Sequence, residues 1–234
     1  MHKPAIHPDV VSRATQRRGR LRVFDSLNPE RTAHVVVDLQ NGFMDEEVAI
    51  AYVPTAVEIV PNVNKLAAAV RRTGGKVVWI KMAFDAATVA SWSEYFDILT
   101  PAKRARALAN MAPGARGHDL YPTLEVKPED AIVDKHRFSA FVQGSSELPE
   151  LLRAQGYDTV LITGTVTNVC CESSARDAMM LNFKTIMVSD SNAARTDAEH
   201  NATLASFYSV FGDVMDTDHL IRCLEANAQA RAAA

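Results

Sequence analysis

"DTVLITGTVTNVCCESSARDAMMLNF", residues Asp158–Phe183, decides the fold because it joins a strand directly to a helix. Its first part, "DTVLITG", has no alternation of apolar and polar residues, which is typical of a strand buried on both faces. The second part, "NVCCESSARDAMMLNF", places small and apolar residues at helical spacing. A strand that runs into a helix in this way predicts one step of a parallel sheet.

The same step recurs along the chain from about residue 33. β-Rich segments lie at residues 33–40, 76–82, 130–135, 158–164, 184–190 and 212–217. Helical patterns occupy residues 55–75, 145–157, 168–183, 197–211 and the segment from about 218. We expect the helix within 55–75 to begin close to Glu58, since Pro61 fits only a first turn. The alternation predicts an α/β fold, with helices on both faces of a parallel sheet.

The domain organisation follows from where this alternation holds. Residues 1–30 form a basic arm, residues 31–228 a single domain, and residues 229–234 an Ala-rich tail. We expect the arm to lie on the domain or on a neighbouring subunit. Within the domain, residues 83–129 interrupt the alternation, and an insertion of this length is typical of a lid or a subunit contact. Both interpretations of the insertion stay open.

Composition and charge exclude several classes of protein. The 234 residues carry a net charge of −3, which gives no general attraction to nucleic acid or to an anionic membrane. The apolar runs are strand-sized, far below the roughly 20 residues of a membrane span, and the first residues lack a signal-peptide core. The three cysteines form no disulfide framework, which favours a cytoplasmic location with free thiols.

Reactive side chains follow three of the expected strands. Asp38 comes at the end of the first strand, Lys135 ends the third, and Cys170 follows the fourth. The carboxyl ends of parallel strands meet at one edge of the sheet, where α/β proteins bind ligands. Each residue alone is more typical of a turn, a solvated charge or packing. A carboxylate, an ammonium group and a thiol at one edge together indicate a catalytic site.

The two adjacent cysteines have different roles in this interpretation. Asn168 is a suitable N-cap, which would place Cys170 in a first helical turn, where the helix dipole lowers a thiol pKa. Successive helix positions differ by about 100°, so Cys171 points elsewhere and falls on one stripe with Ala175, Ala178 and Met179. We therefore expect Cys170 to be the nucleophile and Cys171 to pack. A disulfide between them and a zinc site are the less favoured alternatives.

These segments resemble the isochorismatase-like cysteine hydrolases, a superfamily that includes nicotinamidase, N-carbamoylsarcosine amidohydrolase and ureidoacrylate amidohydrolase. The similar segments are "VVVDLQNGF", "DKHRFSAF", "ITGTVTNVCCESSARDAMMLNF" and "VSDSNAARTDAEHNATL". The resemblance implies a three-layer α/β/α fold with a six-stranded parallel sheet in the order 3-2-1-4-5-6. It implies a catalytic triad of Asp38, Lys135 and Cys170. It also implies a cis peptide bond before Val166, and an oxyanion hole formed by the Val166 and Cys170 amides.

The implied strand order can be checked against side-chain length. Strand three would lie two strands from strand one, about 10 Å away at about 4.8 Å per strand. A lysine side chain is long enough to cross most of this gap, whereas an aspartate or serine is not. The residue type at position 135 therefore agrees with the strand order.

The resemblance also has limits that bear on the reaction. Nicotinamidase-type members carry a metal-binding Asp-x-His after the second strand, but "IKMAFDAATVASW" has no histidine. We expect no metal and no other cofactor. Members that cleave the vinyl ether of isochorismate usually lack the cysteine, so Cys170 favours a carbon–nitrogen bond. The expected function is a cysteine amidohydrolase acting on a small amide, ureido or carbamoyl compound through a thioester. A vinyl-ether hydrolase and a non-catalytic binding scaffold are the alternatives.

Several residues close to the candidate site could contact a substrate. Residues near the strand ends that could contact substrate are Gln40, Phe43, His136, Arg137 and Phe138. Trp92 of the insertion could also line the pocket, or else anchor the insertion to the domain. His136 and Arg137 would bind a substrate carboxylate or else lie at the surface, and Phe43 and Phe138 would form apolar walls or core. Gln40 fits a supporting role better than direct contact. The partner we expect is a small molecule rather than nucleic acid or membrane, and the resemblance implies a homo-oligomer, either dimer or tetramer.

Overall fold

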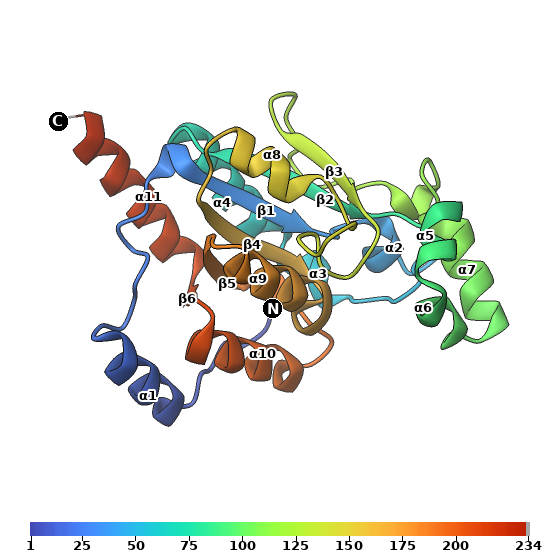
Figure 1. Ribbon diagram of the computed structural model, residues 1–234, viewed down its shortest axis with the longest axis horizontal. Coiled ribbons are helices and arrows are strands. Elements are labelled where there is room, and N and C mark those ends of the chain that lie inside the picture. The colour runs from blue at the N-terminus through green and yellow to red at the C-terminus, as the bar shows by residue number, and fades with distance from the viewer. Residues whose placement is uncertain (233–234) are drawn as a thin grey trace.

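A six-stranded parallel sheet forms the centre of the computed structural model, which describes residues 1–232 (Figure 1). Its order is β3-β2-β1-β4-β5-β6, so the implied order is confirmed. The strands are β1 Thr32–Val37, β2 Lys76–Met82, β3 Ala131–Lys135, β4 Thr159–Thr165, β5 Lys184–Ala193 and β6 Asp213–Met215. Every residue of β1 and β4 is buried, as expected for strands covered on both faces.

Helices cover both faces of this sheet. The longer ones are α1 Pro8–Arg18, α4 Val60–Arg72, α7 Pro101–Met111, α9 Glu172–Met180, α10 Asp197–Val210 and α11 Thr217–Ala232. The shorter ones are α2 Asn41–Met44, α3 Thr55–Glu58, α5 Ala86–Ser91, α6 Ser93–Asp97 and α8 Leu148–Ala154, with turns η1 Pro29–Arg31, η2 Arg116–His118 and η3 Thr167–Cys171. Figure 1 shows α8 and α9 in front of the sheet and α4 behind it, where α4 contacts α11. The expected three-layer arrangement is confirmed.

The helix expected to begin close to Glu58 is α4, and a separate short helix, α3, precedes it. α3 ends at Glu58, and α4 begins at Val60 with Pro61 in its first turn. Proline has no N–H and its ring clashes with the carbonyl four residues earlier, so a continuous helix could not pass through this position. Ile59 lies at the break and is fully buried.

The basic arm lies against its own domain. α1 contacts α10, and Arg18 pairs with the buried Asp213 of β6 at 2.7 Å. The other oxygen of Asp213 accepts hydrogen bonds from the backbone N–H groups of Val23 and Phe24, at 2.6 and 2.8 Å. The Arg18 guanidinium also stacks over the Tyr208 ring at 4.0 Å. Part of the arm's positive charge is therefore neutralised within the chain.

The insertion at residues 83–129 contains α5, α6, α7 and η2. Figure 1 shows α5, α6 and α7 gathered at the end of the sheet to which β1 points. Aromatic rings hold this insertion together: Phe84 meets Phe96 edge-on at 5.2 Å, and Trp92 stacks on Tyr95 at 4.4 Å. The insertion therefore lies at the same end of the sheet as Asp38.

The carboxyl-terminal end of the described chain is helical. α11 continues through residues 229–232 of the Ala-rich tail, while residues 233–234 lie outside the described part. Within residues 1–232, no helix has the length and apolar character that crossing a bilayer requires.

Candidate active site

Asp38 and Lys135 meet at the carboxyl end of the sheet. Asp38 follows the last residue of β1 with a positive φ of 54°, and its N–H bonds the Ile80 carbonyl of the neighbouring strand. Lys135 is the last residue of β3, two strands away. Its Nζ lies 2.9 Å from Asp38 Oδ2, and both side chains are completely buried. The lysine side chain therefore spans the width of β2, as the strand spacing predicted.

This ion pair sets the charges of the site. Burial is the largest single influence and would lower the pKa of Lys135, but the charges and hydrogen bonds of Asp38 and Cys170 together outweigh it and the pKa is raised. Lys135 Nζ also donates a hydrogen bond to the Arg137 carbonyl at 3.0 Å, which supports the ammonium form. Burial raises the pKa of Asp38, and the positive charge of Lys135 partly offsets this rise.

Cys170 lies beside this pair in a π-helical turn, η3, that precedes α9. The expected N-cap was wrong. Val166 is the cap residue, and among residues 1–232 the Asn168 side chain makes no capping bond and its Oδ1 finds no hydrogen-bond partner. The expected low thiol pKa was also wrong. Burial raises the pKa of Cys170, and the charge of Lys135 only partly opposes this. The resting thiol is therefore protonated.

Cys171 points away from the site, as helix geometry predicted. Its side chain is fully buried, and its Sγ lies 3.9 Å from the Thr163 carbonyl of β4. Ala175 and Ala178 are buried on the same stripe, whereas Met179 is 37% exposed and does not belong to it. The described cysteines are all free thiols, so no disulfide joins the adjacent pair.

The end of β4 brings its backbone close to Asp38. Gly164 has a φ of 120° and pairs with Val37, the residue before Asp38. A Cβ at this position would overlap the Val37 carbonyl, so only glycine fits. The next peptide bond, between Thr165 and Val166, is cis, in agreement with the resemblance.

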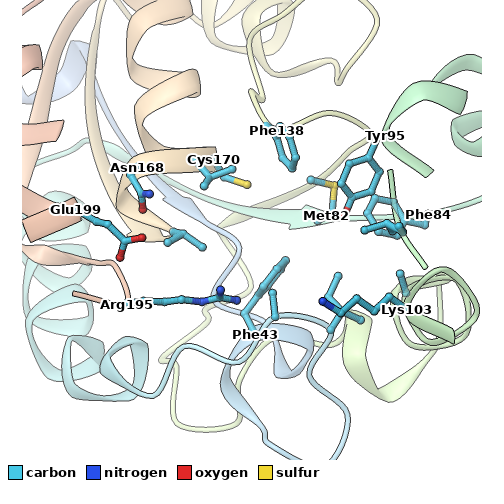
Figure 2. Close-up of a pocket in the computed structure, with 16 residues that line it drawn as sticks. Phe43, Met82, Phe84, Tyr95, Lys103, Phe138, Asn168, Cys170, Arg195 and Glu199 are labelled. Atoms are coloured by element: carbon cyan, nitrogen blue, oxygen red, sulfur yellow. The ribbon is translucent and has the colours of Figure 1, made fainter. Parts of the chain in front are cut away.

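A cavity of about 400 Å³ opens beside Cys170. Its walls are mainly apolar and include Phe43, Met82, Phe84, Tyr95 and Phe138. Figure 2 shows the Cys170 sulfur turned toward this cavity, on the side where Phe138 and Met82 lie. A thiol beside a buried acid–ammonium pair therefore faces a mainly apolar cavity.

The sequence between β1 and the start of α11 matches a known domain. Residues 32–219 fit the family model described as the isochorismatase domain. The chain belongs to the isochorismatase family.

Individual relatives agree with this assignment. The chain is 29% identical to the ureidoacrylate amidohydrolase RutB of Acinetobacter baylyi, over 94% of this chain and 97% of that protein. Its structure resembles that of a cysteine hydrolase from Pseudomonas syringae pv. phaseolicola, with a TM-score of 0.77, 29% identity, and coverage of 86% of this chain and 96% of that chain. It also resembles the N-carbamoylsarcosine amidase of Thermoplasma acidophilum, with a TM-score of 0.64, 26% identity, and coverage of 80% and 97%.

In this isochorismatase-family chain, only two of the six expected substrate contacts line the cavity. Phe43 and Phe138 do so. Gln40 does not, because it is fully buried and its amide is used by the backbone. Its Nε2 donates to the carbonyls of Met82 and His118, and its Oε1 accepts from the Met82 N–H. Gln40 therefore braces the ends of β1 and β2 rather than contacting a ligand.

The other three expected contacts lie behind the cavity wall. Trp92 packs edge-on against Phe138 at 4.9 Å and so supports a wall residue. His136 lies 2.8 Å from the Thr88 hydroxyl through Nδ1. Arg137 donates to the Ser91 carbonyl at 3.0 Å and to the His136 carbonyl at 2.6 Å. Neither His136 nor Arg137 lines the cavity, and the carboxylate-binding role expected for them stays a prediction.

Arg195 and Lys103 are the cations that do reach the cavity, and the sequence reasoning missed both. Figure 2 shows them extending toward its centre from opposite sides. Neither forms an ion pair within residues 1–232. Arg195 follows the end of β5, so extending the search for strand-end residues from the fourth strand to the fifth would have found it. Lys103 belongs to α7 and gave no comparable signal.

Two further polar residues of the cavity were also missed as ligand contacts, Asn168 and Glu199. Figure 2 shows them together on the Arg195 side. Nowhere in the described chain do three or more His, Cys, Asp or Glu side chains gather closely enough to hold a metal ion.

Proposed function

We propose that the chain is a cysteine amidohydrolase that cleaves a carbon–nitrogen bond of a small amide, ureido or carbamoyl compound. The observation that carries the proposal is the Cys170 thiol, which faces the cavity beside the buried Asp38–Lys135 pair. The similarity to an amidohydrolase and an amidase supports the same reaction class. Amide hydrolysis needs a nucleophile and a base, and these residues supply both.

In the first half of the proposed reaction, Asp38 accepts the Cys170 proton and the sulfur attacks the substrate carbonyl carbon. A carbon–sulfur bond forms, and the carbonyl π electrons move to oxygen. The N–H groups of Val166 and Cys170 stabilise this oxyanion, an effect worth on the order of 10²–10³ in rate for each donor. Lys135 keeps Asp38 ionised until the proton is transferred.

In the second half, the carbon–nitrogen bond breaks, and Asp38 gives its proton to the departing ammonia or amine. The product is a thioester on Cys170. Water then loses a proton to Asp38 and attacks the thioester carbon. The carbon–sulfur bond breaks, the acid product leaves, and Asp38 returns its proton to the sulfur, which restores the thiol and the carboxylate. Asp38 therefore acts alternately as base and acid, which suits a carboxyl group whose pKa burial has raised.

The protonated resting thiol fits this sequence of steps. Burial raises the pKa of Cys170, so no free thiolate is stored in the site. The thiolate forms when substrate is present and its proton has moved to the neighbouring carboxylate. Such a thiol should resist oxidation and alkylation better than an exposed low-pKa cysteine.

The cavity also restricts the substrate. At about 400 Å³ it is at the small end of ligand pockets, which run from about 300 to 1,000 Å³. Arg195 and Lys103 bring two positive charges to its mainly apolar walls, against the one negative charge of Glu199, whose carboxylate accepts a hydrogen bond from the Thr196 hydroxyl. Arginine binds a carboxylate with paired hydrogen bonds. We therefore propose a small substrate that carries a carboxylate as well as the amide or ureido group.

A substrate panel tests the proposal. Amides, ureido acids and carbamoyl compounds are each offered as a free acid and as its neutral methyl ester or amide, and ammonia release is measured. The expected result is hydrolysis of at least one free acid, with a preference over its neutral counterpart. Pyruvate release from isochorismate without ammonia release from any panel member would contradict it. The homo-oligomer that the resemblance implies is measured on the same preparation by light scattering.

A further inference from the structure

The amino-terminal end of the chain reaches the wall of the candidate site. His2 is buried, with 7% of its surface exposed, and it contacts the segment between β5 and α10 that carries Arg195. Its Nδ1 lies 2.7 Å from Asp197 Oδ1, and its Nε2 lies 2.9 Å from Ala194 N. These contacts bracket Arg195 from both sides.

Both ring nitrogens have partners on this segment. A carboxylate only accepts hydrogen bonds, so His2 Nδ1 donates to Asp197. Nε2 lies within hydrogen-bond distance of both polar backbone atoms of Ala194, at 2.9 Å from the N–H and 3.0 Å from the carbonyl. The Ala194 carbonyl already accepts from the Thr55 hydroxyl at 2.6 Å, so the backbone of Ala194 is bound at both polar atoms. The hydrogen bond from His2 also lowers the pKa of Asp197.

The segment is also fixed on its carboxyl-terminal side. Thr196 is the N-cap of α10: its hydroxyl accepts from the Glu199 N–H at 3.2 Å and donates to the Glu199 carboxylate at 2.9 Å. Arg195 therefore lies between two fixed residues, Ala194 and Thr196. The ring of His2 supplies the hydrogen bond on the first of these.

His2 also stacks on a second buried histidine that leads to the nucleophile. The rings of His2 and His200 lie 4.5 Å apart and nearly parallel. His200 Nε2 donates to the Ser189 carbonyl at 2.9 Å, so its Nδ1 accepts from the Thr167 hydroxyl at 3.0 Å. Thr167 is the first residue of η3, the turn that holds Cys170.

We infer that His2 is a positioning residue for the site. By holding Ala194 and Asp197, its ring sets the direction in which Arg195 enters the cavity. The effect on substrate rests on the proposed function, in which Arg195 binds the substrate carboxylate. The effect on the segment itself does not depend on the reaction, because it is a property of the hydrogen bond at Ala194.

Three variants of the full chain separate the contributions of the ring. His2→Ala removes ring and hydrogen bonds, His2→Phe keeps a ring to stack on His200 but has no donor or acceptor, and His2→Gln keeps an amide donor and acceptor. His7→Ala is the matched control, because His7 is an exposed histidine at the start of α1. All are compared with the wild-type protein.

Hydrogen exchange at Ala194 N–H is the first measurement. We expect exchange about five- to tenfold faster in His2→Ala and His2→Phe, the effect of losing one net hydrogen bond. It should stay at the wild-type rate in His2→Gln and His7→Ala. Exchange of Leu204 N–H, within α10, should not change in any variant and so excludes general unfolding. A wild-type exchange rate of the Ala194 N–H in His2→Ala and His2→Phe would overturn the inference. An exchange rate in His2→Gln as fast as that in His2→Ala would also overturn it.

The Michaelis constant for the best carboxylate substrate is the second measurement. It should rise about five- to tenfold in His2→Ala and His2→Phe while kcat stays within about twofold, because only binding is affected. The neutral counterpart should show no such rise. An unchanged KM alongside faster exchange would overturn the link to Arg195. If the wild-type protein hydrolyses no amide, the proposed function fails, and the exchange at Ala194 still decides whether His2 holds the segment.

Discussion

The Nζ of Lys135 lies 2.9 Å from the Oδ2 of Asp38, although β2 lies between the strands that carry the two residues and neither side chain reaches solvent. A buried charge that loses its partner is costly, typically about 3–5 kcal/mol. Lys135→Met should therefore lower the free energy of unfolding by about this amount at neutral pH, and so should Asp38→Asn. Urea unfolding followed by circular dichroism measures both changes.

The double variant Asp38→Asn with Lys135→Met provides the control. It leaves no buried charge, so its loss of stability should be smaller than the sum of the two single losses, by about 1–3 kcal/mol. Strict additivity would show that the pair does not act as a unit. All three variants should also lose amide hydrolysis, since each removes a group that the proposed reaction uses.

Arg195 should control the affinity for a carboxylate substrate. Arg195→Gln removes a charge-assisted hydrogen bond worth about 1.5–3 kcal/mol, which corresponds to a rise in KM of roughly 10- to 100-fold. The KM of the neutral methyl ester should change little. The matched control is Arg137→Gln, because Arg137 follows the end of β3 but is bound to Ser91 and His136 behind the cavity wall. A larger effect from Arg137→Gln than from Arg195→Gln would contradict the assignment.

The buried His34 should make the fold sensitive to acid. Burial lowers the pKa of His34 from 6.5 to about 3, so the native state holds this ring neutral. The unfolded chain takes up the proton near pH 6.5. The contribution of the neutral His34 ring to the free energy of unfolding is therefore fully present above pH 6.5. It is lost as the pH falls from 6.5 toward 3, by up to about 1.4 kcal/mol per pH unit.

The variant His34→Gln isolates this contribution. Glutamine does not titrate, and it can still bond the Thr163 hydroxyl, which lies 2.9 Å from the His34 ring. The free energy of unfolding of the wild-type protein should therefore fall more steeply between pH 6.5 and pH 4 than that of the variant. The exposed His7→Gln variant should follow the wild-type curve. Parallel curves for wild type and His34→Gln would contradict the prediction.

The strands and the edge of the sheet that carries the candidate site could be predicted because both depend on local sequence. Apolar runs such as Val35–Val37 mark buried strands, and the residue that ends each run falls at the same edge. The sheet order itself came from the resemblance. With that order, the length of a lysine side chain was enough to place Lys135 beside Asp38.

Other features depend on contacts between distant segments, and the sequence did not reveal them. Whether burial or the helix dipole dominates the pKa of Cys170 depends on how completely the site is enclosed, and the enclosing Tyr95 belongs to the insertion. The direction of Arg137 depends on Ser91, more than 40 positions earlier in the chain. The position of a residue after a strand therefore predicts the edge of the sheet at which it lies. It does not predict whether its side chain enters the cavity or lies behind the cavity wall.

The adjacent cysteines offer the most direct test of the nucleophile. Both are buried and they differ by one position, so Cys170→Ala and Cys171→Ala are closely matched changes. The measurement is kcat/KM for ammonia release from the best panel substrate, with near-ultraviolet circular dichroism to confirm that each variant is folded. The account predicts that Cys170→Ala lowers this value by at least about 10⁴-fold, while Cys171→Ala stays within about tenfold of wild type and mainly loses stability. Turnover retained in a folded Cys170→Ala variant would contradict it.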